Sequence, residues 1–195
     1  MMVNTEWGAF DYGHAVLLRT PFENKVDRES INPHFQAYEK FISGMYLGEI
    51  TRNVLLALVD ATPQPILFAG KATKRLNKHH GLDTEMLSLI EGRSGDSDDP
   101  AATLLKEDLL EKLAPTTLQR LKAIQEIVQE YLGYAPGEVS LRDAALVRRA
   151  ARLSACAFAT DALQMGYVTG LGKDARSAEA PAVDGKPYVI GINGR

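Results

Sequence analysis

The chain contains a single cysteine, Cys156, among its 195 residues. One cysteine cannot form a disulfide within the chain, which favours a reducing compartment. A chain of this length can bury roughly 70% of its unfolded surface, so it can build a core without such a bridge. Because alanines surround Cys156 in the sequence, we expect its thiol to be a packing group.

The sequence also lacks a long hydrophobic run and a strong charge of either sign. No stretch approaches the roughly 20 apolar residues that span a bilayer, and the N-terminus has no basic segment followed by an apolar one. The net charge is only -3, from 22 basic and 25 acidic residues. This balance creates no strong field, so neither nucleic acid nor membrane is an expected partner. A cytoplasmic location is the expectation.

Hydrophobic periodicity predicts a mostly helical chain. Apolar residues recur every three or four positions over residues 33–60, as is typical of an amphipathic helix, and the prolines of "ATPQP" end it. Ser140 and Asp143 form the pattern of a capping box. Strand-like patterns occur near both ends of the chain, in "MMVNTEWGAF" and "KPYVIGINGR". Further helices are predicted over four ranges: 83–91, 104–113, 117–133 and 140–166.

Two glycines, Gly44 and Gly48, interrupt the predicted 33–60 helix. Each costs about 1 kcal/mol relative to alanine in a helix interior. Three explanations are open for them: close approach by another backbone, contact with a ligand, or a break between two helices.

Two polar clusters receive a structural interpretation. His79 and His80 are adjacent, so their side chains point in different directions and a surface pair is expected instead of a metal site. The arginines of the last predicted helix are expected to form a solvated face: Arg142, Arg148, Arg149 and Arg152.

Three segments, in this order, together resemble the hexokinase family: "VNTEWGAF", "INPHFQAYEKFISGMYLGEITR" and "RRAARLSACAFA". The middle segment is the most specific, because it is long and mixed in chemistry. "LRTPFENKVDRESINP" resembles the family's loop and short helix between two glutamate motifs, and "LDTEMLSLIE" resembles another of its helix starts. The resemblance extends from Met2 to about Gly170 and resumes weakly at "VIGINGR".

The resemblance implies an α/β fold. The chain would be a fragment of the hexokinase large domain, with an actin-like, ribonuclease-H-like architecture that is mostly helical with few strands. Residues 1–195 would all belong to this partial domain, with a flexible connector at 170–185. A domain that lacks some of its strands exposes sheet edges, so self-association through such edges is expected.

The resemblance also implies a sugar-binding site. Family members bind glucose in a cleft, and the matching positions here are Glu6, Gln36 and Glu39. An ionised carboxylate accepts hydrogen bonds from two hydroxyls, and a charge-assisted bond is about twice as strong as a neutral one. Taken singly, Glu6 and Glu39 would be interpreted as surface charges; only the joint motif assigns them to a hexose.

For the nucleotide, the resemblance assigns Gly44, Thr84 and Ser88. Thr84 and Ser88 stand at a predicted helix start, where exposed N–H groups and hydroxyls bind anions. ATP and magnesium are expected as cofactors of the whole enzyme, with their binding by this chain left open. A threonine at a helix start is also a common cap, so that interpretation stays open beside the nucleotide contact.

The family's catalytic aspartate and phosphate loops have no match in this sequence. In the family they lie upstream of "NTEWGAF", and a segment that closes over adenosine lies downstream of the "GVDGS" turn. No catalytic residue and no metal ligand is assigned, and a missing base alone removes roughly 10²–10⁴ in rate. This chain alone is therefore expected to be inactive. His34 stands where the family pattern N-P-G-x-Q has glycine, which alters the cleft floor if that glycine needs a positive φ.

Several functions stay open, and whether the chain is an enzyme is not decided. The first is ATP:hexose 6-phosphotransferase, which phosphorylates glucose in glycolysis, with this chain as a portion; a start at two methionines and an end within a turn suit a fragment. The second is a non-catalytic, hexokinase-like sugar-binding or regulatory protein, which His34 and the long 93–139 stretch favour slightly. A third is a helical interaction domain with coincidental similarity, in which Glu6 and Glu39 have no role.

Overall fold

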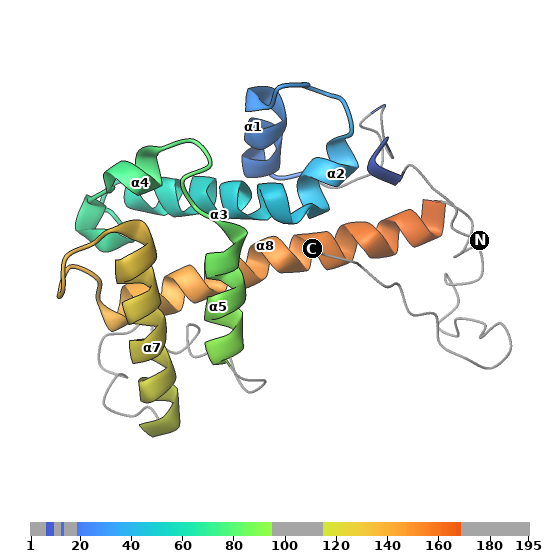
Figure 1. The fold of residues 1–195 in the computed structure, drawn as a ribbon. Helices are drawn as coiled ribbons and strands as arrows, with labels where there is room; N and C mark the ends of the chain where they lie inside the picture. The colour runs from blue at the N-terminus through green and yellow to red at the C-terminus, as the bar shows by residue number, and fades with distance from the viewer. Residues whose placement is uncertain (1–6, 10–12, 14–18, 95–114, 169–195) are drawn as a thin grey trace, which may run out of the picture. The chain divides into compact units, whose positions relative to one another are not determined.

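The computed structural model describes residues 7–9, 13, 19–94 and 115–168 (Figure 1). The connector expected at 170–185, the helix predicted at 104–113 and the C-terminal strand-like pattern lie outside these residues. The described elements follow in chain order: η1 (Trp7–Ala9), α1 (Pro21–Glu29), α2 (Ala37–Ile42), α3 (Gly44–Val59), η2 (Phe68–Gly70), α4 (Lys74–Asn77), α5 (Thr84–Ser94), α7 (Pro115–Leu132) and α8 (Leu141–Val168).

The part of the chain that the structure describes contains helices and no strand. A mostly helical chain is thus confirmed there, but the few strands implied by the resemblance are not found in these ranges. The reason is that the described ranges carry the three- and four-residue period, whereas the alternating patterns sit near the chain ends. Without a strand, these ranges offer no sheet edge for the expected self-association. None of the described helices is both long and apolar enough to cross a membrane.

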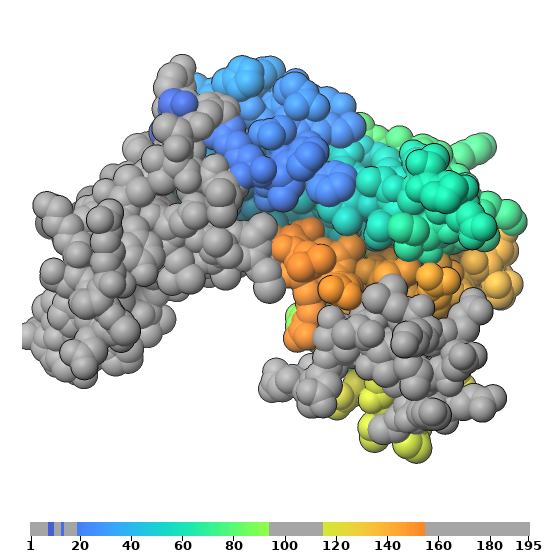
Figure 2. All heavy atoms as spheres, turned by 180° about the vertical axis from the view of Figure 1, so that it is seen from behind, coloured from blue at the N-terminus to red at the C-terminus, as the bar shows by residue number. Residues whose placement is uncertain are grey.

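The chain divides into two compact units. The first unit comprises residues 1–44 and 156–195, and the second unit comprises residues 45–155. In the second unit, α5 and α7 lie side by side, and the Thr51 hydroxyl of α3 donates a 3.0 Å hydrogen bond to Ser154 of α8. Figure 2, seen from behind, shows the teal residues of α3 next to the orange residues of α8.

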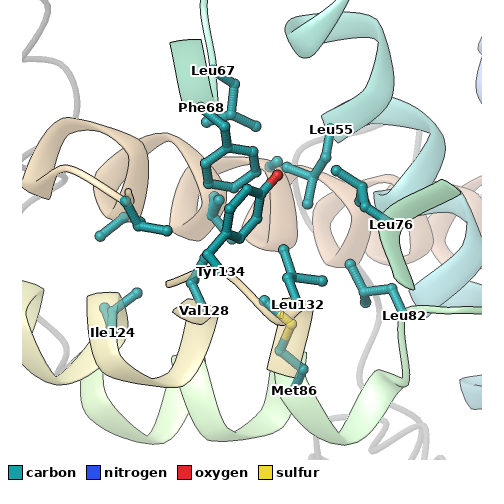
Figure 3. Close-up of a cluster of buried hydrophobic side chains, with 14 of the residues drawn as sticks. Leu55, Leu67, Phe68, Leu76, Leu82, Met86, Ile124, Val128, Leu132 and Tyr134 are labelled. Atoms are coloured by element: carbon teal, nitrogen blue, oxygen red, sulfur yellow. The ribbon is translucent and has the colours of Figure 1, made fainter. Parts of the chain in front are cut away.

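A large hydrophobic core fills the second unit (Figure 3). Helix α7 contributes apolar side chains at three- and four-residue intervals, the spacing that puts them on one face. The face is buried, with Val128 and Leu132 at 0% exposure. The labelled members of the core come from α3, η2, α4, α5, α7 and the segments next to these elements: Leu55, Leu67, Phe68, Leu76, Leu82, Met86, Ile124, Val128, Leu132 and Tyr134.

The predicted capping box begins α8. The Ser140 N–H donates to Asp143 Oδ2 at 2.8 Å, and the Asp143 N–H donates to Ser140 Oγ at 3.0 Å. The other carboxylate oxygen of Asp143 accepts a 2.9 Å bond from the Phe68 N–H, which ties η2 to α8. The predicted stop at Gly166 is wrong, because α8 continues to Val168. One glycine costs only about 1 kcal/mol in a helix, and a long helix can outweigh it.

The predicted solvated arginine face is wrong at Arg148, whose exposure is only 3%. Arg148 shares a helix face with Ala144 and Ala151, which are 0% and 6% exposed, because residues three and four apart stack on one side. Arg152 is partly exposed and pairs with Glu91, with 3.0 Å between Nη2 and Oε1.

Candidate functional site

Asp27 organises the connection between α1 and α2 in the first unit. Its side chain is 2% exposed, and both carboxylate oxygens accept 3.1 Å bonds from the His34 N–H. Lys40 Nζ, itself buried, donates to Asp27 Oδ1 at 2.8 Å and also to the Asn32 carbonyl. A buried charge is tolerated when it is paired and hydrogen-bonded, so these contacts fix the loop at 30–36.

His34 occupies the position where the family pattern has glycine. Its φ is 66°, in the left-handed region that glycine adopts most easily. The position therefore does carry the positive φ that would explain a glycine there. The histidine is accommodated because Asp27 holds its backbone, and its ring Nδ1 lies 3.2 Å from Asp27 Oδ2.

The predicted 33–60 helix is two helices, α2 and α3, separated at Ser43. The break explains Gly44, which is the first residue of α3. Gln36 is the residue before α2, with φ 49°, so it lies outside the helix that carries Glu39. Its left-handed backbone starts α2 without a side-chain cap bond.

Glu39 lies in the first turn of α2 and is exposed, although both of its chain neighbours are buried. Within the described ranges, no residue donates a hydrogen bond to its carboxylate. The backbone of Gly8, in η1, lies directly beside it: a Cβ atom on Gly8 would stand 2.8 Å from Glu39 Oε2. Glu6 itself lies outside the described residues, two positions before Gly8. The "NTEWG" and "YEK" motifs therefore meet through Gly8 and Glu39.

The predicted nucleotide residues fall in two places. Gly44 belongs to the first unit and is exposed, and no atom of the described residues lies within 4 Å of where its Cβ would stand. Thr84 begins α5 in the second unit and is half-buried. Ser88 follows one turn later, with its hydroxyl donating a 3.4 Å bond to the Thr84 carbonyl.

Gly48 positions Thr84, because it allows α3 to approach the start of α5. Its N–H donates a 3.0 Å bond to Thr84 Oγ1. A Cβ at this position would stand 2.2 Å from the Leu82 carbonyl oxygen, so only glycine fits. Of the three explanations open for Gly48, close approach by another backbone is the one that the structure supports.

Glu49 and Arg52 form a buried ion pair that the sequence motifs did not predict. Arg52 Nε donates to Glu49 Oε2 at 2.8 Å, and the His80 N–H donates to the same oxygen at 2.7 Å. Burial raises the pKa of Glu49, but the bonds and charge of Arg52, the His80 N–H and the charge of His79 lower it by more. The net pKa lies below the ordinary 4.5. Charges three residues apart in a helix were the available signal.

The two histidines next to this pair are exposed, as expected. His79 Nε2 lies 3.6 Å from Glu49 Oε1, and the two imidazole rings are 4.3 Å apart. The Glu49 carboxylate is bonded to Arg52 and to the His80 N–H, so its negative charge is compensated by these groups.

Comparison with known proteins agrees with the sequence motifs. The family model described as "Hexokinase" matches residues 1–132. A glucokinase from Aspergillus niger is 35% identical over 173 residues, which cover 85% of this chain and 32% of that protein. Hexokinase-2 from Rattus norvegicus is 50% identical over 92 residues, or 47% of this chain and 10% of that protein.

A solved structure gives the same result. The structure titled "hexokinase from Schistosoma mansoni complexed with glucose" matches with a TM-score of 0.61 and 30% identity, over 83% of this chain and 30% of that one. The chain thus spans about a third of the length of the glucokinase, which is covered over 32%.

Proposed function

This chain belongs to the hexokinase family, and from that premise we propose that it supplies the sugar-binding part of an ATP:hexose 6-phosphotransferase. The proposed substrate is glucose or a similar hexose, and the proposed setting is glycolysis in the cytoplasm. The observation that carries the proposal is the close approach of Gly8 to Glu39, where a Cβ at position 8 would stand 2.8 Å from Oε2. It joins two motifs that are 31 positions apart in the sequence.

The proposed chemistry is recognition and orientation of the sugar. Glu39 is exposed, and an ionised carboxylate accepts hydrogen bonds from hydroxyl groups. Charge-assisted bonds from Glu39, with Glu6 and Gln36 as the other proposed contacts, would fix the hexose in one orientation. Orientation of a bound reactant lowers the barrier of the later transfer step.

Nucleotide contact by Gly44, Thr84 and Ser88 is part of the proposal for the whole enzyme. The open space at Gly44 and the start of the 11-residue helix α5 at Thr84 support it, since helix N-termini favour phosphate oxygens. When bound in the whole enzyme, ATP with magnesium would supply the phosphoryl group. Magnesium has no proposed ligand among Glu49 and its neighbours, because the Glu49 carboxylate beside His79 is committed to Arg52.

A glucose titration of the purified chain tests the sugar site. We expect saturable binding that Glu39→Gln weakens by about tenfold or more, because a bond to a charged acceptor is lost. Glu126→Gln is the matched control, since Glu126 is an exposed glutamate of α7 in the second unit; it should bind as the unmodified chain does. Equal affinity in the chain and in Glu39→Gln would contradict the proposal.

A coupled assay with ATP and glucose tests the division of labour. The chain alone is expected to give no turnover, because the family's base and phosphate loops have no match in its sequence. Turnover at the rate of a whole hexokinase would overturn this part of the proposal. The conclusion drawn from the glucose titration would not change.

The alternative is a non-catalytic, hexokinase-like protein that binds sugar and regulates. One observation favours it: His34, with a positive φ of 66°, stands where the family pattern has glycine, so the loop departs from that pattern in sequence. The DNA upstream of this chain separates the two functions. Phosphate loops and an aspartate motif encoded in frame support the phosphotransferase, and their absence supports the regulatory protein.

A further inference from the structure

Helix α2 is held firmly around Glu39. Tyr38 and Phe41 are each 2% exposed, and the Arg19 guanidinium lies 5.1 Å from the Phe41 ring centroid. Lys40 is tied to the buried Asp27 carboxylate at 2.8 Å. With the backbone fixed on both sides, the place of the Glu39 carboxylate depends on its own side-chain rotamer.

Gly8 limits that rotamer. A Cβ atom on Gly8 would stand 2.8 Å from Glu39 Oε2, 3.2 Å from its Cβ and 3.5 Å from its Cδ. Moving only Oε2 would relieve the first contact. The second contact is with the Glu39 Cβ, which is fixed to the α2 backbone. A methyl group at position 8 would therefore displace the carboxylate or separate η1 from α2.

We propose that Gly8 is a positioning residue for the sugar site: by lacking a side chain, it lets the Glu39 carboxylate lie against the η1 backbone. The inference rests on the proposed sugar-binding function. Gly8 itself needs no contact with the sugar, and its effect on affinity passes through Glu39. Gly13 provides a matched comparison, because no atom of the described residues lies within 4 Å of where its Cβ would stand.

A double-mutant cycle on the full 195-residue chain tests this, with glucose affinity measured by ligand-observed NMR. Gly8→Ala should weaken glucose binding by about tenfold, as expected when a charge-assisted bond is misplaced. In a Glu39→Ala background the same change should have less than about a twofold effect, because the carboxylate that it displaces is gone. Gly13→Ala should change affinity less than about twofold in both backgrounds.

The same variants are compared by thermal unfolding without sugar. Gly8→Ala should lower Tm by about 3 °C more in the Glu39 background than in the Glu39→Ala background. The entropic effect of replacing glycine is common to both backgrounds and cancels in the cycle. A variant that merely destabilised the fold would lower Tm without changing the affinity of the folded protein.

Equal, additive effects of Gly8→Ala in both backgrounds would overturn the inference, and so would unchanged glucose affinity in Gly8→Ala. If the unmodified chain binds no glucose, the proposed function fails, and the thermal cycle alone decides whether Gly8 positions Glu39. If Glu39→Ala abolishes measurable binding, the thermal cycle again decides: coupling supports the inference and additivity overturns it.

Discussion

The two units differ in the size of their buried apolar clusters. The second unit surrounds one large cluster of buried apolar side chains, including Leu55 and Val128 at 0% exposure. Among the described residues of the first unit, the buried apolar cluster has only three members: Ala37, Tyr38 and Phe41. Hydrogen bonds and a buried ion pair, Asp27–Lys40, hold its loop instead.

This difference follows from what each region is proposed to do. Apolar packing contributes about 25 cal/mol per Å² of buried surface and is insensitive to direction, which suits a scaffold. Hydrogen bonds contribute less but fix orientation, which suits a loop that sets the place of Glu39. The candidate sugar residues thus lie on the more polar unit, while Thr84 and Ser88 lie on the more apolar one.

The largest loss of stability is expected from breaking the buried Glu49–Arg52 pair of the second unit. Glu49→Gln should reduce the free energy of unfolding by about 3–5 kcal/mol, because the Arg52 guanidinium loses its buried counter-charge. Chemical denaturation measures this. Glu91→Gln, at an exposed pair with Arg152, is the control and should cost less than about 1 kcal/mol. Similar losses in the free energy of unfolding for both variants would contradict the role of Glu49–Arg52 as a buried, stabilising ion pair.

The same pair makes a prediction about pH. The pKa of Glu49 is below its ordinary 4.5 in the folded protein. The ionised carboxylate therefore contributes fully to the free energy of unfolding above about pH 4.5. This contribution is lost as pH falls through the lowered folded pKa. The unmodified chain should therefore lose more stability than Glu49→Gln on acidification below about pH 4.5. Parallel stability curves for the two proteins would count against this role.

The next largest loss of stability is expected from breaking the Asp27–Lys40 pair of the first unit. Asp27→Asn should cost about 3 kcal/mol, because Lys40 keeps its buried charge without a carboxylate partner. Hydrogen exchange should become faster in α1 and α2 while α7 is unchanged. Glu29→Gln, at an exposed pair with Lys25, is the control on the same helix and should cost less than about 0.5 kcal/mol. Faster exchange in α7 alone would refute the comparison.

A smaller effect sharpens the contrast within α3. Gly48→Ala should cost about 1–3 kcal/mol, because its Cβ would collide with the Leu82 carbonyl, 2.2 Å away. Gly44→Ala, in open space at the start of the same helix, should be neutral or stabilise by up to about 1 kcal/mol. Thermal unfolding distinguishes them. A tolerated Gly48→Ala would show that α5 does not approach α3 so closely.

The smallest effect concerns the loop that departs from the family pattern. His34→Gly should raise the free energy of unfolding by about 1 kcal/mol or less, because glycine adopts φ 66° without a steric cost. The lost contact between Nδ1 and Asp27 offsets part of the gain. A loss of stability, measured by chemical denaturation, would mean that the imidazole contact outweighs the backbone strain.

Local sequence patterns predicted helices and a helix cap. The spacing of apolar residues located α5 and α7 within a few positions, and Ser140 with Asp143 predicted the α8 cap. Long-range contacts were beyond such patterns. The Asp27–Lys40 pair joins residues 13 positions apart, and nothing in the local sequence distinguishes these charges from surface ones.

The candidate site was predictable only through its motifs. Glu39, Thr84 and Ser88 were assigned by resemblance, and the structure shows why Gly48 had to be glycine. It could not be deduced from the chain order that Gly8 lies against Glu39, since that depends on how η1 approaches α2. The left-handed backbone at Gln36 could not be predicted either, because helix propensity allowed the predicted 33–60 helix to include this residue.

Hydrogen exchange of the full chain with and without saturating glucose tests the central claim most directly, that the polar unit holds the sugar through Glu39. The predicted result is increased protection of the α2 amides, with no comparable change in α7, and loss of that increase in Glu39→Gln. Unchanged α2 protection, or an increase confined to α7, would contradict the claim.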